Sequence, residues 1–454
     1  MRQTSSAKKQ NLRHGQFRIT HATTALGGCL ILMSHCAPAL ATTQDSNPSA
    51  KASFHSGISI HEASEWGAEQ LVPFILAHNP QLRAAQSARQ AARAGIKSAQ
   101  ALPNPRLDWH QGRNTARIAG VTPGSVQGWS ISQPIDNPNA RKARMDVASA
   151  TELESIHLIG MTRNDLVSQT RVRIYQGLLH QAKADAAAED VHLLEQVRER
   201  VRLRVESGEA ARYEIIKADA EIITARERLQ TARLMMEQSK IQLNQLAAGQ
   251  LPPQWKLLGD LKDSHELLDL NQLNQLVSKN NPELRLLQAE VNKAQALLRG
   301  AESSRWPAME LRYSKSQDPE FRQGQWGVGV QIPLLDNRSG PIAQASSELE
   351  RAQIRFEGRQ AELKQEILQT WKLLEMARLR IEALSQGSVR EAEAALRVAQ
   401  AAYRFGERGI LDVLDAQRVL RSVRADLIEA RYQLQEARVE LDRLIGQHIE
   451  PSTF

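Results

Sequence analysis

The chain has 454 residues, of which 41% are hydrophobic and only 4% aromatic. This composition is poor in the aromatic residues that fill one large globular core, and its wealth of Ala, Leu, Gln, Glu and Arg is typical of long helices. The formal charge of +7 does not indicate nucleic-acid binding, because five of the 58 basic residues lie within the first 41 residues and the other 53 nearly balance the 51 acidic ones.

The first 41 residues have the layout of a secretory signal peptide. Basic residues precede the apolar segment ALGGCLILM at 25–33, and a small-residue site follows and ends at Ala41. Cleavage after Ala41 would leave 42–60 as a flexible N-terminal tail.

Both cysteines, Cys29 and Cys36, lie in this leader, so the mature protein would have no thiol for a disulfide, a metal or catalysis. As an alternative to cleavage at Ala41, the segment LGGC at 26–29 resembles a lipoprotein cleavage box, which would leave the chain lipidated at Cys29.

The mature chain contains two copies of one unit. The segment HNPQLRAAQSARQAARAGIKSAQALPNPRLDW from His78 is echoed by NNPELRLLQAEVNKAQALLRGAESSRWPAMEL from Asn280, at an offset of about 200 residues. We therefore predict a duplicated organisation with these boundaries: first repeat 61–250, linker 251–264, second repeat 265–446 and C-terminal tail 447–454.

Each copy continues from a shorter helix into two predicted strands. In the second copy, QWGVGVQIP at 325–333 alternates strictly between apolar and small or polar residues, and MELRYSKS at 309–316 alternates in the same way. The first copy offers two shorter alternating segments near Trp109 and Trp129. Prolines mark the places where strands meet helices.

The apolar faces of these strands predict contact with membrane lipid. No segment after the leader reaches the 18 or more apolar residues of a membrane helix, so a membrane crossing by the mature chain would require strands. Four strands cannot close a barrel alone, and open strand edges are intolerable in lipid, so the sheet would have to combine with other chains. The alternative is a soluble surface sheet with one face on a core. The predicted membrane-facing residues are Trp109, Trp129, Trp326, Val328 and Val330.

Long helical hairpins follow the strands. Helical patterns of about 65 residues, or about 100 Å, begin near 141 and near 342. Each pattern ends at a glycine, Gly208 or Gly406, which we expect to turn the chain. A second helix then carries five heptads with large residues at one seam position and mostly small ones at the other. In the second copy the large residues are Val413, Leu420, Leu427, Leu434 and Leu441, and in the first copy Ile215, Ile222, Leu229, Met236 and Leu243.

The duplicated unit, the segments LPNPRLDW, ISQPID and VQIPLLDNR beside the strands, and the tip YRFGERGILDVLDAQRVLRSVRADLIEARYQLQEARVELDRLIG together resemble the TolC outer-membrane efflux family over residues 61 to 446. The contexts LPNP and QPID are more similar to the heavy-metal, CzcC-like branch.

This resemblance implies a mainly α fold in which three chains combine four strands each into a twelve-stranded membrane barrel above a periplasmic α-helical tunnel. It implies an outer-membrane exit duct of a tripartite pump in a Gram-negative bacterium, with most of the chain in the periplasm. The implied partners are two further copies, a periplasmic adaptor protein, an inner-membrane transporter of the RND type and outer-membrane lipid, without nucleic acid. RND-type export of heavy-metal cations is the expected function, and a multidrug or type I protein-secretion duct is the alternative.

Two acids follow the second glycine turn. Under the resemblance, Asp412 and Asp415 face the lumen at the inner end of the tunnel, where three chains would supply six carboxylates that favour cations. The alternative is ordinary hairpin chemistry, with Asp412 as a helix N-cap and Asp415 as a first-turn acid.

The resemblance also implies a network that closes the tip. Tyr403, Arg408 and Glu214 fall on its positions, and contact between Arg408 and Glu214 of neighbouring chains would hold the tip shut. The adaptor would meet the hairpin turns, with contacts expected from Gly208, Arg212, Gly406 and Glu407.

An enzyme is not expected. The twelve histidines are scattered, without HExxH or a cluster at ligand spacing, so we expect neither a metal site nor a cofactor. The remaining rival is a soluble coiled-coil structural protein, which would explain the heptads but neither the leader nor the duplicated strands.

Overall fold

The computed structural model describes residues 64–115, 117–262, 269–332 and 335–447. The predicted signal peptide with Cys29, the tail at 42–60 and the C-terminal tail beyond residue 447 lie outside these described residues.

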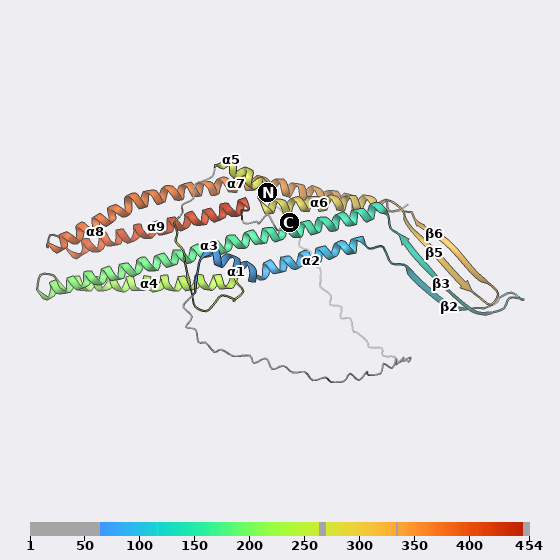
Figure 1. Ribbon diagram of the computed structural model, residues 1–454, viewed down its shortest axis with the longest axis horizontal. Coiled ribbons are helices and arrows are strands. Elements are labelled where there is room, and N and C mark those ends of the chain that lie inside the picture. The colour runs from blue at the N-terminus through green and yellow to red at the C-terminus, as the bar shows by residue number, and fades with distance from the viewer. Residues whose placement is uncertain (1–63, 116, 263–268, 333–334, 448–454) are drawn as a thin grey trace, which may run out of the picture. The chain divides into compact units, whose positions relative to one another are not determined.

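The described residues are mostly helical and run twice through the same series of elements, which confirms the predicted duplicated fold (Figure 1). The first series is β1 (Ser64–Trp66), α1 (Ala68–His78), α2 (Pro80–Gln100), β2 (Arg106–Asn114), β3 (Gly124–Ile135), α3 (Pro138–Glu206) and α4 (Arg212–Leu246). The second is β4 (Trp255–Leu257), α5 (Leu270–Asn280), α6 (Pro282–Ser303), β5 (Ala308–Gln317), β6 (Arg322–Gln331), α7 (Ser339–Glu382), the π-helical segment η1 (Ala383–Ser388), α8 (Val389–Arg404) and α9 (Ile410–Ile445).

An Asn-Pro pair separates the two short helices at the start of each repeat. The Asn281 side chain accepts a hydrogen bond from Leu284 N at 2.9 Å, which caps α6, and its Nδ2 donates to Leu444 O at 2.9 Å. Asn79 does the same in the first repeat, where it caps α2 and donates to Leu246 O at 2.9 Å. In both copies one side chain therefore joins the start of a helix to the C-terminal end of the last helix of the repeat.

The heptad seams form the contacts within and between the hairpins. All ten seam positions of α4 and all ten of α9 are buried or half-buried. Helix α3 packs against α4 of its own hairpin and against α9 of the other. Near the tips Val201, Ile222, Leu396 and Val413 share one apolar cluster, so the two hairpins have a common core there. In the described part of the chain, no helix has the length and apolarity needed to cross a lipid bilayer.

The long helix of the second copy is interrupted. The sequence predicted one helix of about 65 residues from near 342, and this is the 69-residue α3 in the first copy. In the second copy, α7 ends at Glu382 and a six-residue π-helical segment leads into α8. This segment, ALSQGS, contains Gly387 and two serines, which weaken an α-helix and allow a local change of hydrogen-bond pattern.

A small parallel sheet was not predicted. Strand β4 lies within the predicted linker 251–264 and pairs with β1, with Trp66 opposite Leu257. Trp255 and Leu257 are buried in a core with Leu71 and Leu178. The linker is therefore anchored to the helices of the first repeat.

Candidate functional site

Strands β2, β3, β5 and β6 form one antiparallel sheet in that order. Trp109 lies opposite Trp129, and Tyr313 lies opposite Trp326. Because directly opposed residues of an antiparallel pair lie on the same face, these aromatic residues share one face with Val328 and Val330. The ring centroids of Trp129 and Tyr313 are 5.5 Å apart, and those of Tyr313 and Trp326 are 4.7 Å apart.

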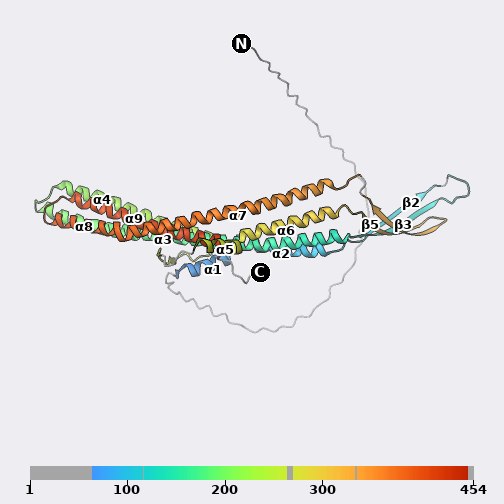
Figure 2. The same ribbon diagram turned by 90° about the horizontal axis from the view of Figure 1, so that it is seen from above.

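This face of the sheet, which we call the apolar face, is exposed. The exposed fraction is 66% for Trp109, 74% for Trp326 and 61% for Val328. On the other face of β3, Gly128 and Ser132 are buried. A sheet in water has the opposite arrangement, with its apolar face buried and its polar face exposed. In the described residues the outer edges of β2 and β6 pair with no strand (Figures 1 and 2).

The hairpin tips turn at the two predicted glycines. Gly208 has φ of 80° and Gly406 has φ of 74°, which is the left-handed region where a side chain is strained. The tips lie against each other: Arg204 Nη1 donates to Tyr403 O at 3.0 Å, and its guanidinium lies 4.7 Å from the centre of the Tyr403 ring.

Two residues of the predicted closing network meet within one chain. Tyr403 Oη donates to Glu214 Oε2 at 3.1 Å, and Tyr403 is only 5% exposed. Burial, followed by the Glu214 charge, raises the pKa of Tyr403 to about 12, so its hydroxyl keeps the proton that it donates. This bond connects α8 of the second hairpin to the start of α4 in the first.

The third member, Arg408, pairs within its own turn instead. Its Nη1 lies 3.5 Å from Asp412 Oδ1, and the side chain is 65% exposed. The contact between Arg408 and Glu214 of neighbouring chains stays a prediction.

Each acid predicted for the constriction has an arginine beside it. Asp415 Oδ1 accepts a hydrogen bond from Arg418 Nη1 at 3.1 Å, as Asp412 pairs with Arg408. The alternative in which Asp412 is an N-cap is wrong, because α9 begins at the buried Ile410 and Gly409 is its N-cap. The lumen-facing role of both acids stays a prediction.

Sequence reasoning did not predict that Arg418, the partner of Asp415, also connects the two hairpins. Arg418 of α9 also donates from Nη2 to Glu221 Oε1 of α4. Beside Arg418, Gln417 Nε2 donates to Asp190 Oδ1 of α3 at 2.8 Å. Arg418 and Gln417 flank the apolar heptad seam of α9, and polar residues at such positions commonly pair with the facing helix. This heptad position could have predicted that both residues contact a facing helix.

The residues predicted to meet an adaptor lie at the tips. Arg212 begins α4 and is exposed, and Glu407 is exposed in the second turn beside Gly406. Their contact with an adaptor stays a prediction, as does contact of Trp109, Trp129, Trp326, Val328 and Val330 with lipid.

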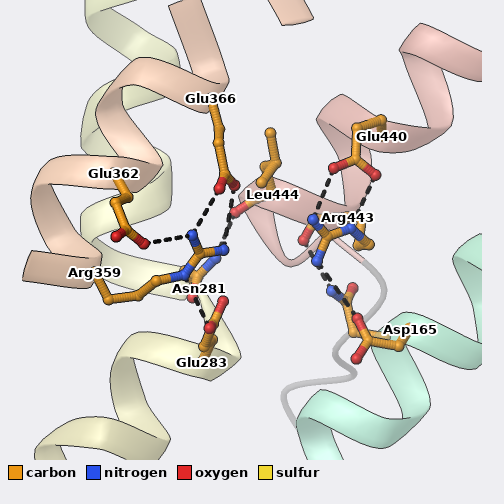
Figure 3. Close-up of polar contacts among 10 residues, drawn as sticks. Asp165, Asn281, Glu283, Arg359, Glu362, Glu366, Glu440, Arg443 and Leu444 are labelled. Carbon is orange, nitrogen blue, oxygen red and sulfur yellow. Dashed lines mark hydrogen bonds and ion pairs between the residues drawn. The ribbon is translucent and has the colours of Figure 1, made fainter. Parts of the chain in front are cut away.

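A second polar cluster joins the repeats far from the tips (Figure 3). Arg359 contacts three carboxylates, Glu283 at 2.9 Å, Glu362 at 3.1 Å and Glu366 at 2.6 Å. In the same region Arg443 Nη1 of α9 lies 3.6 Å from Asp165 Oδ1 of α3, so this pair connects the second repeat to the first. The ion pairs of Arg359 with Glu283 and of Arg443 with Asp165 connect different helices. Within the described ranges no group of three His, Cys, Asp or Glu side chains is arranged to hold a metal ion.

Comparison with known proteins agrees with this geometry. The family model described as outer membrane efflux protein matches residues 71–249 and 273–447. The cobalt-zinc-cadmium resistance protein CzcC of Cupriavidus metallidurans is 25% identical over 374 residues, which cover 81% of this chain and 87% of the relative. The solved structure of CusC is 19% identical, with a TM-score of 0.71 over 83% of this chain and 91% of that one. The outer membrane channel CmeC of Campylobacter jejuni is 15% identical, with a TM-score of 0.73 over 85% of this chain and 86% of that one.

Proposed function

Because the chain belongs to the outer membrane efflux protein family, we propose that it is the outer-membrane exit duct of a tripartite pump that exports heavy-metal cations. Three copies assemble, and each contributes four strands to a closed barrel and two helical hairpins to a periplasmic tunnel. An inner-membrane transporter supplies the energy, and a periplasmic adaptor meets the tips.

The exposed apolar face carries the proposal. Large apolar side chains on β2, β3, β5 and β6 point away from the protein, although water would favour the opposite arrangement. In lipid this arrangement is favourable, but the free edges of β2 and β6 then need partners, because lipid offers no hydrogen bonds. Further copies of the sheet supply those partners and close the barrel.

The hairpin tips give the duct a closed state. Tyr403 and Glu214 connect the second hairpin to the first, and Arg418 connects them again through Glu221. Separation of the hairpins breaks both connections, so an adaptor that binds the separated tips opens the tunnel.

Metal cations are supported as substrate by the similarity to a relative named for cobalt, zinc and cadmium resistance. Asp412 and Asp415 add a preference for cations at the tip. Arg408 and Arg418 offset part of that negative charge, so the preference is weaker than six unpaired carboxylates would give.

Growth of a deletion strain, with and without the restored gene, tests the substrate. We expect hypersensitivity to zinc, cadmium or cobalt and unchanged resistance to hydrophobic drugs. Hypersensitivity to drugs alone would contradict metal export and favour a multidrug duct, while unchanged growth in metals and drugs with loss of a secreted protein would favour protein export.

The soluble coiled-coil alternative is tested separately by cell fractionation. The exit duct predicts a trimer in the outer-membrane fraction. A soluble dimer would overturn the proposal whatever the growth test gives.

A further inference from the structure

A cavity of about 480 Å³ lies between the two hairpins and is lined by α3, α4 and α9. Most of its wall is apolar, with Leu193, Met235 and Ile428 among the lining side chains. It extends along α3 from His180 to Leu193, which is about 20 Å at the helical rise of 1.5 Å per residue. This volume lies within the range of roughly 300–1,000 Å³ that is usual for small-molecule sites.

Three buried polar atoms of the lining have no hydrogen-bond partner among the described residues: His180 Nδ1, Arg228 Nη1 and Gln417 Oε1. Gln417 is only 3% exposed, and its Nε2 is held by Asp190 at 2.8 Å, so its amide cannot move freely to find another partner. Buried polar atoms of folded proteins are nearly always hydrogen-bonded. Unbonded polar atoms around one apolar cavity therefore point to a ligand that carries polar groups: Arg228 Nη1 needs an acceptor, and Gln417 Oε1 needs a donor.

The charged residues that line the cavity indicate whether the ligand's polar group is an anion or a cation. In the described part of the chain, the lining residue Arg228 has no ion-pair partner. Its neighbour in sequence, Glu227, is exposed and accepts from Thr231 Oγ1 at 2.9 Å instead. An anion is the natural acceptor for a half-buried guanidinium. The other lining cations are already paired: Lys183 with Glu429 at 2.6 Å, Arg421 with Asp190 at 3.5 Å and Arg424 with Glu393 at 2.8 Å.

We propose that this cavity binds an elongated amphipathic organic anion, whose carboxylate accepts from Arg228 Nη1 and whose apolar body lies along α3 toward His180. Helix α4 belongs to the first hairpin and α9 to the second, so the bound anion contacts both hairpins. The site goes beyond the exit-duct role, and binding to it can be measured without transport.

Binding of 11-(dansylamino)undecanoic acid to the full-length protein in a maltoside detergent tests the proposal. We expect saturable dansyl fluorescence with the wild type and an affinity about tenfold weaker with Arg228→Gln, which removes a charge-assisted hydrogen bond. Arg233→Gln is the matched control, because Arg233 is exposed on the same helix and does not line the cavity. The methyl ester of the probe, which has no anionic head, should bind Arg228→Gln as well as it binds the wild type.

A second pair of variants tests the place of binding. Ala187 lines the cavity and Ala188 does not, so Ala187→Phe should abolish saturable binding and Ala188→Phe should leave it unchanged. Equal binding by wild type, Arg228→Gln and Ala187→Phe would overturn the proposal, as would the absence of saturable binding to the wild type. An ester that loses as much affinity with Arg228→Gln as the acid does would overturn the choice of an anion.

Discussion

The hydroxyl of Tyr403 donates a hydrogen bond of 3.1 Å to the carboxylate of Glu214, across the two helical hairpins of one chain. Tyr403 is buried, and Arg204 Nη1 donates to its carbonyl oxygen at 3.0 Å. In the proposed duct this contact belongs to the closed tip, so its loss shifts the tip toward the open state.

Removal of this hydrogen bond should raise the resting conductance. A hydrogen bond to a charged group contributes about 1.5–3 kcal/mol, so Tyr403→Phe should increase the open fraction by roughly 10- to 100-fold while the tip stays mostly closed. Glu214→Gln keeps an acceptor but loses its charge, so it should give a smaller increase. Planar-bilayer recordings measure this. The matched control is Tyr213→Phe, since Tyr213 is 55% exposed at the same tip and should leave conductance unchanged. Wild-type conductance in Tyr403→Phe would remove this contact from the closing mechanism.

Neutralisation of Arg418 should increase cation preference. Arg418 pairs with Asp415 and Glu221, so Arg418→Gln leaves two carboxylates without their cation. In a salt gradient, Arg418→Gln should shift the reversal potential toward the equilibrium potential of the cation. The double variant Asp412→Asn with Asp415→Asn should shift it in the opposite direction. Identical reversal potentials in all variants would show that these acids do not line the conducting path.

A charge on the apolar face should prevent stable insertion. Val328 and Gln325 lie on opposite faces of β6, and both are exposed in the chain. A lysine near the middle of a lipid-facing strand costs about 2–4 kcal/mol, so Val328→Lys should lower the amount of trimer in the outer membrane, whereas Gln325→Lys should not. Heat-resistant trimer on gels measures the effect. Equal loss in both variants would contradict the assignment of the apolar face to lipid.

The Asn281 side chain should contribute strongly to stability. Asn281→Ala removes the cap of α6 and leaves the Leu444 carbonyl without its donor, which together cost about 2–4 kcal/mol. Denaturant unfolding of the detergent-solubilised protein checks this loss. Asn271→Ala, at an exposed position in the first turn of α5, serves as the control and should change stability by less than about 0.5 kcal/mol. A similar small change for Asn281→Ala would show that the connection between helix ends is not a stabilising contact.

His157 should make stability fall on acidification. Burial, followed by the charge of Arg285, lowers the pKa of His157 below its usual 6.5. Below pH 6.5 the unfolded chain therefore binds more protons than the folded one, so stability decreases as the pH falls from 6.5 to the lower pKa of the folded state. His157→Gln should reduce this loss, measured as the thermal midpoint at pH 7.5 and 5.5, and His192→Gln on the exposed side of the same helix should not. An unchanged pH dependence in His157→Gln would contradict the role of this histidine.

The sequence predicted the parts of the fold that repeat over many residues. The heptads of α4 and α9 and the alternation of β6 each extend over several turns or residue pairs, so periodicity identified the hairpins and the apolar face. Strands β1 and β4 have three residues each, too few for a period of two, and their pairing depends on contacts distant in sequence. The π-helical segment differs from its neighbours only in hydrogen-bond pattern, which periodicity does not resolve.

At the tip, the glycine turns could be expected from the sequence. The family resemblance indicated Tyr403 and Glu214, although the contact that it implied for Glu214 was with Arg408 of a neighbouring chain. The partners of Arg418 could not be expected. Whether Arg418 reaches Asp415, Glu221 or solvent depends on the rotation of α9 relative to α4, which packing sets. The same holds for the cavity between the hairpins, because its lining comes from three helices far apart in sequence.

The most direct test of the exit duct is to isolate the full-length protein from the outer-membrane fraction, determine its mass in detergent and record its conductance in a planar bilayer. The proposed duct predicts a trimer with low resting conductance, which rises in Tyr403→Phe. A soluble protein, or a membrane-bound monomer without conductance in either form, would contradict it.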